Sequence, residues 1–249
     1  MKVIVNADDF GFSKGVNLGI AEAYRNGLVR SATMMANMPG FEHGVEVSRQ
    51  NPCLEIGVHL TLTAGRSLGE RYSTITDDQG NLLRLAEVER RANAGTLDLD
   101  EVEAEYEAQI QKVLEAGIRP SHFDGHHHTQ NLAGVVGVFL KLASKYGVGV
   151  RINDKSLLTG GYAGIKTTAC FSGDFYGEGA TAGNLKAIIS GCGGASIEIM
   201  SHPAYIDCPL LSLSSYNTKR CVELDVLTGS EVAEFIRENG HQICSFADL

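Results

Sequence analysis

Short apolar runs alternate with amphipathic stretches along most of the 249-residue chain. Val3–Asn6 has the composition of a buried strand, and Ser13 can cap a helix that runs to about Asn26. Asp100 and Glu103 have the spacing of a capping box for a later helix. Strands that alternate with helices across short turns favour a largely parallel sheet with right-handed crossovers. The other elements that the pattern predicts are strands over 56–63, 148–152, 196–201 and 242–246 and helices over 100–116, 132–146, 185–190 and 231–239.

This alternation predicts an α/β fold, which we expect to be a distorted, TIM-like (β/α) barrel formed as a single domain over residues 1–249. In a barrel the carboxyl ends of all strands converge on one face, and the loops there surround one site. A doubly wound open sheet is the competing arrangement, and the pattern alone leaves it open. Two polar segments, 64–99 and 153–182, interrupt the rhythm, and long loops of this kind are either functional or mobile.

Composition and charge restrict the classes of partner. The net charge of −9 and the pI near 5.4 argue against a nucleic-acid-binding surface, because phosphate contacts need concentrated Lys and Arg. No apolar run approaches the length of a membrane span, and no signal peptide precedes the first strand. The six cysteines contain no CxxC pair, which indicates reduced thiols. We therefore expect a cytoplasmic protein without nucleic-acid or membrane partners, and we leave a homodimer open.

Two strand ends carry groups that could bind a metal ion. Asp8 and Asp9 follow directly on the first apolar strand. One of them can bind a metal ion while its neighbour acts as a base, although a polar turn in which Asp caps backbone donors fits the pair as well. In the predicted strand over 56–63, His59 shares one face with Thr61 and Thr63. A single strand histidine fits a structural role as well as a ligand role.

The segment 121–128, which reads SHFDGHHH, carries the strongest signal for chemistry. On an extended chain His122, Asp124, His126 and His128 point to one side. Four such groups are costly to bury without partners or a metal ion. Imidazole and carboxylate are the usual ligands of divalent ions, and members of such a group that do not bind the ion can orient its ligands. The segment therefore predicts a metal site.

His202 follows the apolar strand over 196–201, and Pro203 forces the chain to leave that strand. A histidine at this place can donate a proton to a leaving group, or it can simply cap the strand end. Arg151, near the end of the strand over 148–152, is a further candidate for the site. Because these signals lie where a strand meets the following loop, they occupy the catalytic position of a β/α barrel.

Four stretches combine into a family resemblance: Val5–Gly11 (VNADDFG), Gly57–Thr61 (GVHLT), His122–His128 (HFDGHHH) and Ser201–Asp207 (SHPAYID). In this combination the chain resembles the YdjC family of carbohydrate deacetylases, and within it the chitooligosaccharide deacetylase type. The matches run from residue 3 almost to the C-terminus. Enzymes of that type usually carry a further histidine two residues beyond the HHH run, where this chain has Gln130.

The resemblance implies a distorted β/α barrel and a divalent metal ion, with magnesium as the first choice and zinc as the alternative. It implies removal of acetyl groups from N-acetylglucosamine units of chitobiose-like sugars, and so a place in chitin and polysaccharide degradation. Carried over by motif, Asp9, His59 and His126 bind the metal ion and Asp8 is the base.

These assignments lead to one hypothesis for the mechanism, in which His202 protonates the departing amine of a small carbohydrate substrate. The residues expected to orient the ligands or to contact the substrate are Asp124, His128 and Arg151. We expect the segments 64–99 and 153–182 to contact the sugar, and the aromatic residues available to stack on its rings are Tyr162, Phe171, Phe175 and Tyr176.

Other functions use the same ligands. A metal-dependent phosphoesterase or amidohydrolase is the main alternative, and it predicts a second metal ion about 3.5–4 Å from the first. Two histidines and one carboxylate also match the non-haem iron oxygenases. A sugar-binding or metal-buffering protein without turnover would need only the ligands, which leaves Asp8 and His202 without a role.

Overall fold

The computed structural model of the chain describes residues 1–69 and 71–249. The chain forms two compact units. The first contains residues 1–34, 39–56 and 168–249, and the second contains residues 35–38 and 57–167. The long stretch 57–167 of the second unit begins within one strand, Glu55–Leu60 (β3). The prediction of one domain over the whole chain stays a prediction.

The first unit is built around β1 (Lys2–Phe10), a long strand that is buried from its second residue onward. Its strands lie in the order β2-β1-β7-β6, and β8 pairs with the start of β1. The pairing of β1 with β7 is parallel and runs from Lys2 opposite Ser196 to Ala7 opposite Ser201. The bounds of the other strands are β2 (Ser31–Met34), β6 (Cys170–Ser172), β7 (Ser196–Ser201) and β8 (Gln242–Ile243).

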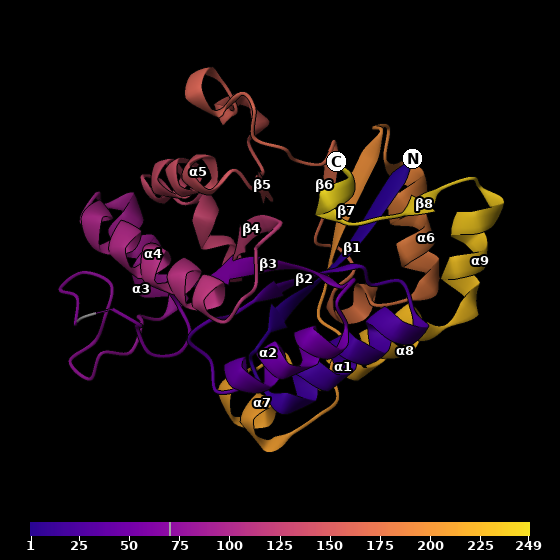
Figure 1. Cartoon of the computed structure of the whole chain (residues 1–249), viewed down its shortest axis with the longest axis horizontal. Coiled ribbons are helices and arrows are strands. Elements are labelled where there is room, and N and C mark those ends of the chain that lie inside the picture. Colours follow the sequence, from indigo (N-terminus) through magenta and orange to yellow (C-terminus); the bar gives the residue numbers. More distant parts are fainter. Residues whose placement is uncertain (70) are drawn as a thin grey trace. The chain divides into compact units, whose positions relative to one another are not determined.

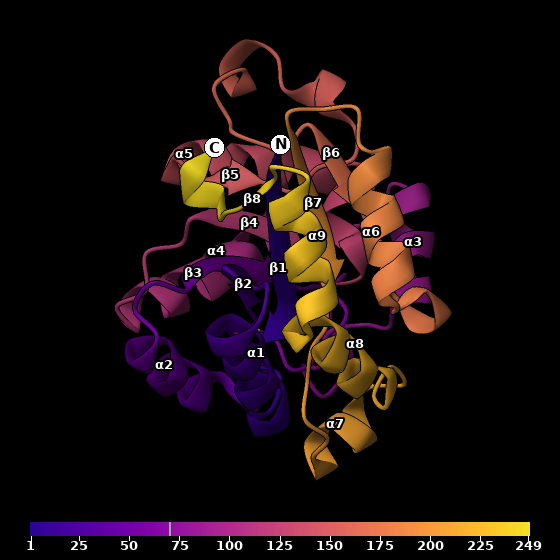
Figure 2. The same cartoon turned by 90° about the vertical axis from the view of Figure 1, so that its right-hand side faces the viewer.

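Helices pack beside these strands. In Figure 1, α1 lies between α2 and α8, and in Figure 2, α9 lies beside α6. As predicted, Ser13 caps α1 by accepting a hydrogen bond from the backbone N–H of Val16. The helices of this unit are α1 (Lys14–Asn26), α2 (Phe41–Gln50), α6 (Ala182–Gly191), α7 (Cys208–Leu213), α8 (Lys219–Thr228) and α9 (Ser230–Glu238).

Two glycines of α1 allow the chain that follows β7 to cross the helix closely. A Cβ atom at Gly15 would lie 2.4 Å from the backbone oxygen of Tyr205, and a Cβ atom at Gly19 would lie 2.4 Å from Cα of Ala204. Asp207 fixes the crossing because one of its carboxylate oxygens accepts a hydrogen bond of 2.7 Å from the backbone N–H of Gly15. The segment that begins at His202 is therefore held against the start of α1.

The second unit contains the parallel strands β3, β4 (His122–Gly125) and β5 (Gly149–Val150), in that order. In the register of β3 with β4, His59 lies opposite Asp124. Its helices are α3 (Leu85–Asn93), α4 (Leu99–Glu115) and α5 (Val135–Tyr146), and α4 runs beside α5 in Figure 1. Both units thus have the parallel β/α construction that the alternating pattern predicts.

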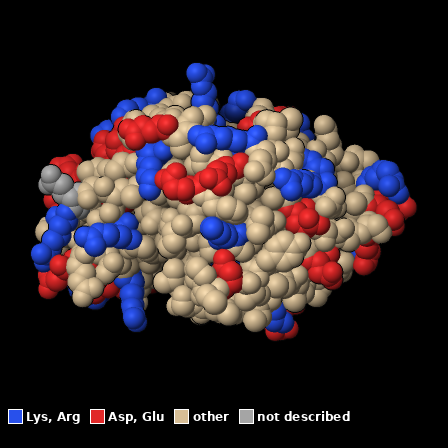
Figure 3. Space-filling view, turned by 60° about the horizontal axis from the view of Figure 1, so that its bottom comes forward, with Lys and Arg blue, Asp and Glu red and all other residues tan. Residues whose placement is uncertain are grey.

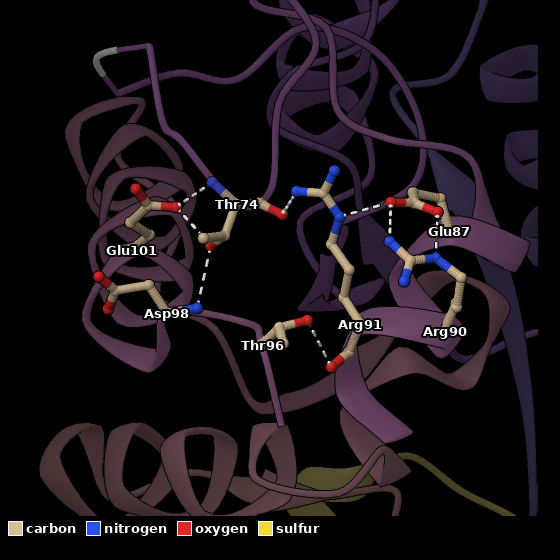
Figure 4. Close-up of polar contacts among 7 residues, drawn as sticks. All are labelled: Thr74, Glu87, Arg90, Arg91, Thr96, Asp98 and Glu101. Atoms are coloured by element: carbon tan, nitrogen blue, oxygen red, sulfur yellow. Dashed lines mark hydrogen bonds and ion pairs between the residues drawn. The ribbon is translucent and has the colours of Figure 1, made fainter. Parts of the chain in front are cut away.

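The polar segment 64–99 has more structure than a loop, because it contains α3. This helix was not predicted, because the residue at its N-cap is Arg84, whose side chain forms no cap hydrogen bond. As Figure 4 shows, Glu101 accepts hydrogen bonds from Thr74, and Arg91 bridges the backbone oxygen of Thr74 and the carboxylate of Glu87. Side chains of two helices thus hold this segment in place.

The predicted capping box of α4 is wrong. The helix begins earlier than predicted, at Leu99, and its N-cap is Asp98. The carboxylate of Asp98 accepts a hydrogen bond of 2.9 Å from the backbone N–H of Asp100. Asp98 is the N-cap because it places a short carboxylate acceptor directly before the first helical residue.

The polar segment 153–182 contains short 3₁₀ turns and β6.

On the face shown in Figure 3, acidic and basic side chains are intermixed. In the part of the chain that the structure describes, no helix has both the length and the apolar composition needed to cross a membrane.

Candidate active site

Asp8 and Asp9 lie at an irregularity near the end of β1. The register of β1 with β2 shifts between Ala7 and Phe10, and Asp9 has a left-handed backbone with φ of 67°. In a regular strand two consecutive side chains point to opposite faces, and the shift breaks that alternation. Both carboxylates are almost fully buried. Non-glycine residues in this conformation are uncommon and concentrate at functional sites.

The two carboxylates have different partners. Asp8 accepts a hydrogen bond of 2.8 Å from the side-chain amide of Asn6. Asp9 forms a buried ion pair with Arg220 of α8, in which Nη2 lies 2.7 Å from Oδ2. The guanidinium also donates through Nε to the backbone oxygen of Tyr216, whereas its buried Nη1 has no hydrogen-bond partner among the described residues. Arg220 therefore keeps one donor group available to a bound oxygen atom.

His202 follows β7, as predicted, and lies among residues of α8 and the segment before it. Its backbone N–H donates a hydrogen bond to the fully buried Glu223, and its Nδ1 lies 3.8 Å from the other oxygen of that carboxylate. The hydroxyl of Tyr216 also donates to Glu223. Burial, together with the neighbouring charge of Glu223, raises the pKa of Tyr216, so this phenol stays neutral and can donate.

In the second unit a buried chain of polar contacts leads to His59. Nδ1 of His59 lies 2.7 Å from Oδ1 of Asp124, and Nη1 of Arg151 lies 3.1 Å from the second oxygen of the same carboxylate. All three side chains are almost completely buried. A carboxylate against Nδ1 favours the tautomer that carries its proton there, which leaves the lone pair of Nε2 for a ligand.

His126 completes this group. Its Nδ1 lies 3.3 Å from Nε2 of His59, and the two rings meet edge to face with centroids 5.4 Å apart. Two imidazole nitrogens at this separation can share either a proton or a cation. The donor set fits a divalent metal ion, because two imidazoles and nearby carboxylates are its usual ligands and a buried carboxylate orients the first imidazole.

The expectation that His122, Asp124, His126 and His128 point to one side of an extended chain is wrong beyond Gly125. A 3₁₀ turn over His126–Asn131 replaces the strand there, and His127 and His128 have φ of 54° and 55°. Within β4 the alternation holds, since Asp124 contacts His59 and the ring of His122 lies against Gly57, two residues before His59. His128 lies in the turn, outside this row.

The structure thus divides the predicted residues between the units. The first unit holds Asp8, Asp9 and His202, and the second holds His59, Asp124, His126, His128 and Arg151. Sequence reasoning missed Arg220, Tyr216 and Glu223. The buried Asp9 signals the need for a cation, but the order of residues does not say which of the 21 Lys and Arg side chains supplies it. His43 contacts the side chain of Asn17 in α1.

Comparison with known proteins gives the family. The sequence profile of the YdjC-like protein family matches residues 2–238. This chain belongs to the YdjC-like family. It is 42% identical to carbohydrate deacetylase 1 of Listeria innocua over 251 aligned positions that cover 100% of both chains.

Solved structures agree with the fold of this YdjC-like chain. An Enterococcus faecalis protein described as a cellobiose-phosphate cleavage protein has a TM-score of 0.91 and 32% identity, over 99% of this chain and 98% of its own. The family 4 carbohydrate esterase of Streptomyces lividans has a TM-score of 0.52 and 15% identity, over 98% and 91% of the two chains, which shows a shared fold. These likenesses confirm the predicted fold class, a TIM-like (β/α) fold.

Proposed function

We propose that this YdjC-like protein is a metal-dependent hydrolase that removes N-acetyl groups from oligosaccharides containing N-acetylglucosamine, of the chitobiose type. The observation that carries the proposal is its full-length similarity, at 42% identity, to a protein named carbohydrate deacetylase. The chemistry of the buried side chains supports it, because each unit buries carboxylate, imidazole and guanidinium groups.

We assign the metal ligands to Asp9, His59 and His126, and magnesium is the first choice of ion, with zinc as the alternative. His59 is prepared for this role by Asp124, which fixes its tautomer, and Arg151 holds Asp124 in turn. His128 stays a candidate for orienting the ligands or contacting the substrate. When bound, the ion would polarise the acetyl carbonyl group and acidify water.

The difference between the two carboxylates of β1 supports their assigned roles. The ion pair with Arg220 stabilises the anionic form of Asp9, which suits a ligand. Asp8 accepts a hydrogen bond from the neutral amide of Asn6, and we assign it as the base that takes a proton from the attacking water. The available Nη1 of Arg220 can donate to an oxygen atom of the substrate.

His202 is the proposed proton donor to the amine, which leaves poorly without a proton. Glu223 holds the backbone of His202, and Tyr216 holds Glu223, so the position of the imidazole is set by contacts within the first unit. Proton removal by Asp8 and proton delivery by His202 then complete cleavage of the amide bond, which yields acetate and a free amino sugar.

We also propose that the protein works in the cytoplasm on a small carbohydrate. All six cysteines are free thiols, which suits a reducing compartment. A homodimer and the absence of nucleic-acid partners stay predictions.

Acetate release from N-acetylated mono- and disaccharides, each with and without a phosphate group, tests the proposal. We expect release from N-acetylglucosamine oligosaccharides, loss of release after chelation, and recovery with added magnesium or zinc. Hydrolysis of phosphate esters without acetate release, in a protein that binds two metal ions per chain, would favour the phosphoesterase alternative. Activity that survives complete metal removal would overturn the proposal.

A further inference from the structure

Tyr176 is an exposed aromatic residue beside His202. Its side chain is 45% exposed, whereas Phe175, its neighbour in the chain, is fully buried. The ring of Tyr176 stacks on Tyr216 with centroids 3.9 Å apart and an angle of 19° between the planes. It meets the ring of His202 edge to face at 5.6 Å. Tyr176, one of the four aromatic residues proposed from the sequence for stacking, thus contacts a proposed catalytic side chain.

The ring of Tyr176 is held in position from several sides. Phe175 anchors the preceding residue in the core, and the backbone N–H of Gly177 donates a hydrogen bond of 3.0 Å to the hydroxyl of Tyr216. Tyr216 is itself fixed by its hydrogen bond to Glu223. The side chain of Asn184 donates to the backbone oxygens on both sides of this turn, at Asp174 and Gly179.

A stacked and anchored ring keeps its exposed surface in one orientation. One face of Tyr176 lies on Tyr216, so its exposed surface belongs to the other face and to the edge. A ring that is already ordered loses little conformational entropy when a ligand packs on it. Binding sites for small molecules combine such apolar surfaces with a few polar groups, and His202 and Arg220 are polar groups of the same unit.

We propose that Tyr176, supported by Tyr216, forms a subsite that packs against a pyranose ring of the substrate. The axial C–H groups of a pyranose form an apolar face with positively polarised hydrogens, and the face of an aromatic ring is negative. The contact with His202 places this subsite beside the proposed proton donor. The proposal rests on the function proposed above, and it specifies which side chain recognises the sugar.

The absence of tryptophan in the chain makes a direct binding test available. Tyr176→Trp introduces one fluorophore at the subsite. Tyr205→Trp introduces the same fluorophore at a tyrosine of similar exposure, 46%, whose backbone N–H donates to Gly15 at the start of α1. Each full-length, metal-loaded variant is mixed with N,N′-diacetylchitobiose or with N-acetylglycine, which has an acetamide but no sugar ring, and emission is recorded at once.

We expect a saturable change in emission for Tyr176→Trp with the disaccharide, no change with N-acetylglycine, and no saturable change for Tyr205→Trp. Equal responses of both variants, equal responses to both ligands, or no response at all would overturn the subsite. The readout needs no turnover. A saturable signal without acetate release would therefore refute the deacetylase function and leave the sugar subsite standing.

Steady-state kinetics provides a second measurement that does not depend on the fluorophore. We expect Tyr176→Ala to raise KM about 3–10-fold with little change in kcat, because the lost contact acts on substrate binding. Tyr176→Phe keeps the ring and should stay within about twofold of the unmodified protein. An unchanged KM in Tyr176→Ala contradicts the proposal.

Discussion

The two units each bury an arginine–aspartate pair, but they use it differently. In the first unit Arg220 contacts Asp9, which is itself a proposed metal ligand. In the second unit Arg151 contacts Asp124, whose other carboxylate oxygen contacts Nδ1 of the proposed ligand His59. The same pair of residue types therefore contains a proposed ligand in one unit and orients a proposed imidazole ligand in the other. A substitution should reveal this difference, because direct and indirect contacts affect metal binding to different degrees.

The largest effect is expected at His126. His126→Ala removes a proposed ligand, so bound metal and turnover should both fall to background, as measured by metal analysis and acetate release. His43→Ala is the matched control, because His43 is a histidine of the first unit that contacts Asn17 of α1. If His126→Ala keeps full metal content and activity, the second unit does not supply this ligand.

Substitution of Asp8 and substitution of Asp9 should have different effects on metal content. Asp8→Asn should keep the metal and lower kcat about 10²–10⁴-fold, because a base is lost while the ligands stay. Asp9→Asn should lower the metal content as well. Metal analysis of both proteins beside their kinetics measures the difference, and the opposite pattern would exchange the two assignments.

Removal of either arginine should destabilise the fold, since it leaves a buried carboxylate without its cation. We expect Arg220→Met and Arg151→Met each to lower the free energy of unfolding by about 3–5 kcal/mol. Denaturant unfolding of the metal-free proteins measures this without interference from the ion. A change below about 1 kcal/mol would show that the ion pair is dispensable, as in exposed pairs.

A substitution of Asp124 tests whether its contact with His59 affects metal binding. Asp124→Asn keeps the size of the side chain but removes the charge that orients His59, and metal affinity should fall about 10–100-fold. Competition with a chelator of known affinity gives this number. A loss as complete as that in His126→Ala would place Asp124 among the ligands themselves.

The smallest effect is expected at Glu101, a carboxylate of the second unit that is held by Ser73 and Thr74 (Figure 4 shows the contact with Thr74). Burial alone would raise the pKa of Glu101, but these hydrogen bonds outweigh it and lower the pKa below its ordinary value of 4.5. The ionised form therefore stabilises the fold above that pH, and this contribution is lost as the pH falls through the lowered value.

Glu101→Gln should accordingly lower Tm at neutral pH by about 2–4 °C, which corresponds to roughly 1 kcal/mol in a chain of this size. The difference in Tm between the two proteins should shrink towards pH 3. A difference that stays constant across this range would show that the charge of Glu101 does not contribute.

Local patterns predicted much of the fold correctly. The strand over 196–201 has the predicted bounds, and α1 begins after Ser13 as its capping pattern requires. Helix α3 was missed because it lacks a side-chain cap, and α8 was missed although it carries Arg220 and Glu223. Weakly amphipathic helices such as α8 are set by the contacts that surround them, which no local pattern contains.

The sequence by itself determined the chemistry available at the strand ends. The paired carboxylates, the HHH run and the SHP turn are local motifs, so their residues and their order along the chain were sufficient to predict a metal-dependent hydrolase of the YdjC family. It could not determine how the backbone continues after Gly125, because the left-handed residues of the 3₁₀ turn depend on their surroundings.

Only the tertiary structure decided the partners of these groups. The contact of Arg220 with Asp9 joins residues 211 positions apart, and the orientation of His59 by Asp124 depends on the register of two strands. Likewise, Phe175 and Tyr176 are adjacent aromatic residues, yet one is buried and the other is exposed beside His202. Burial and long-range contacts are properties of the packed chain, so the residue types alone leave them open.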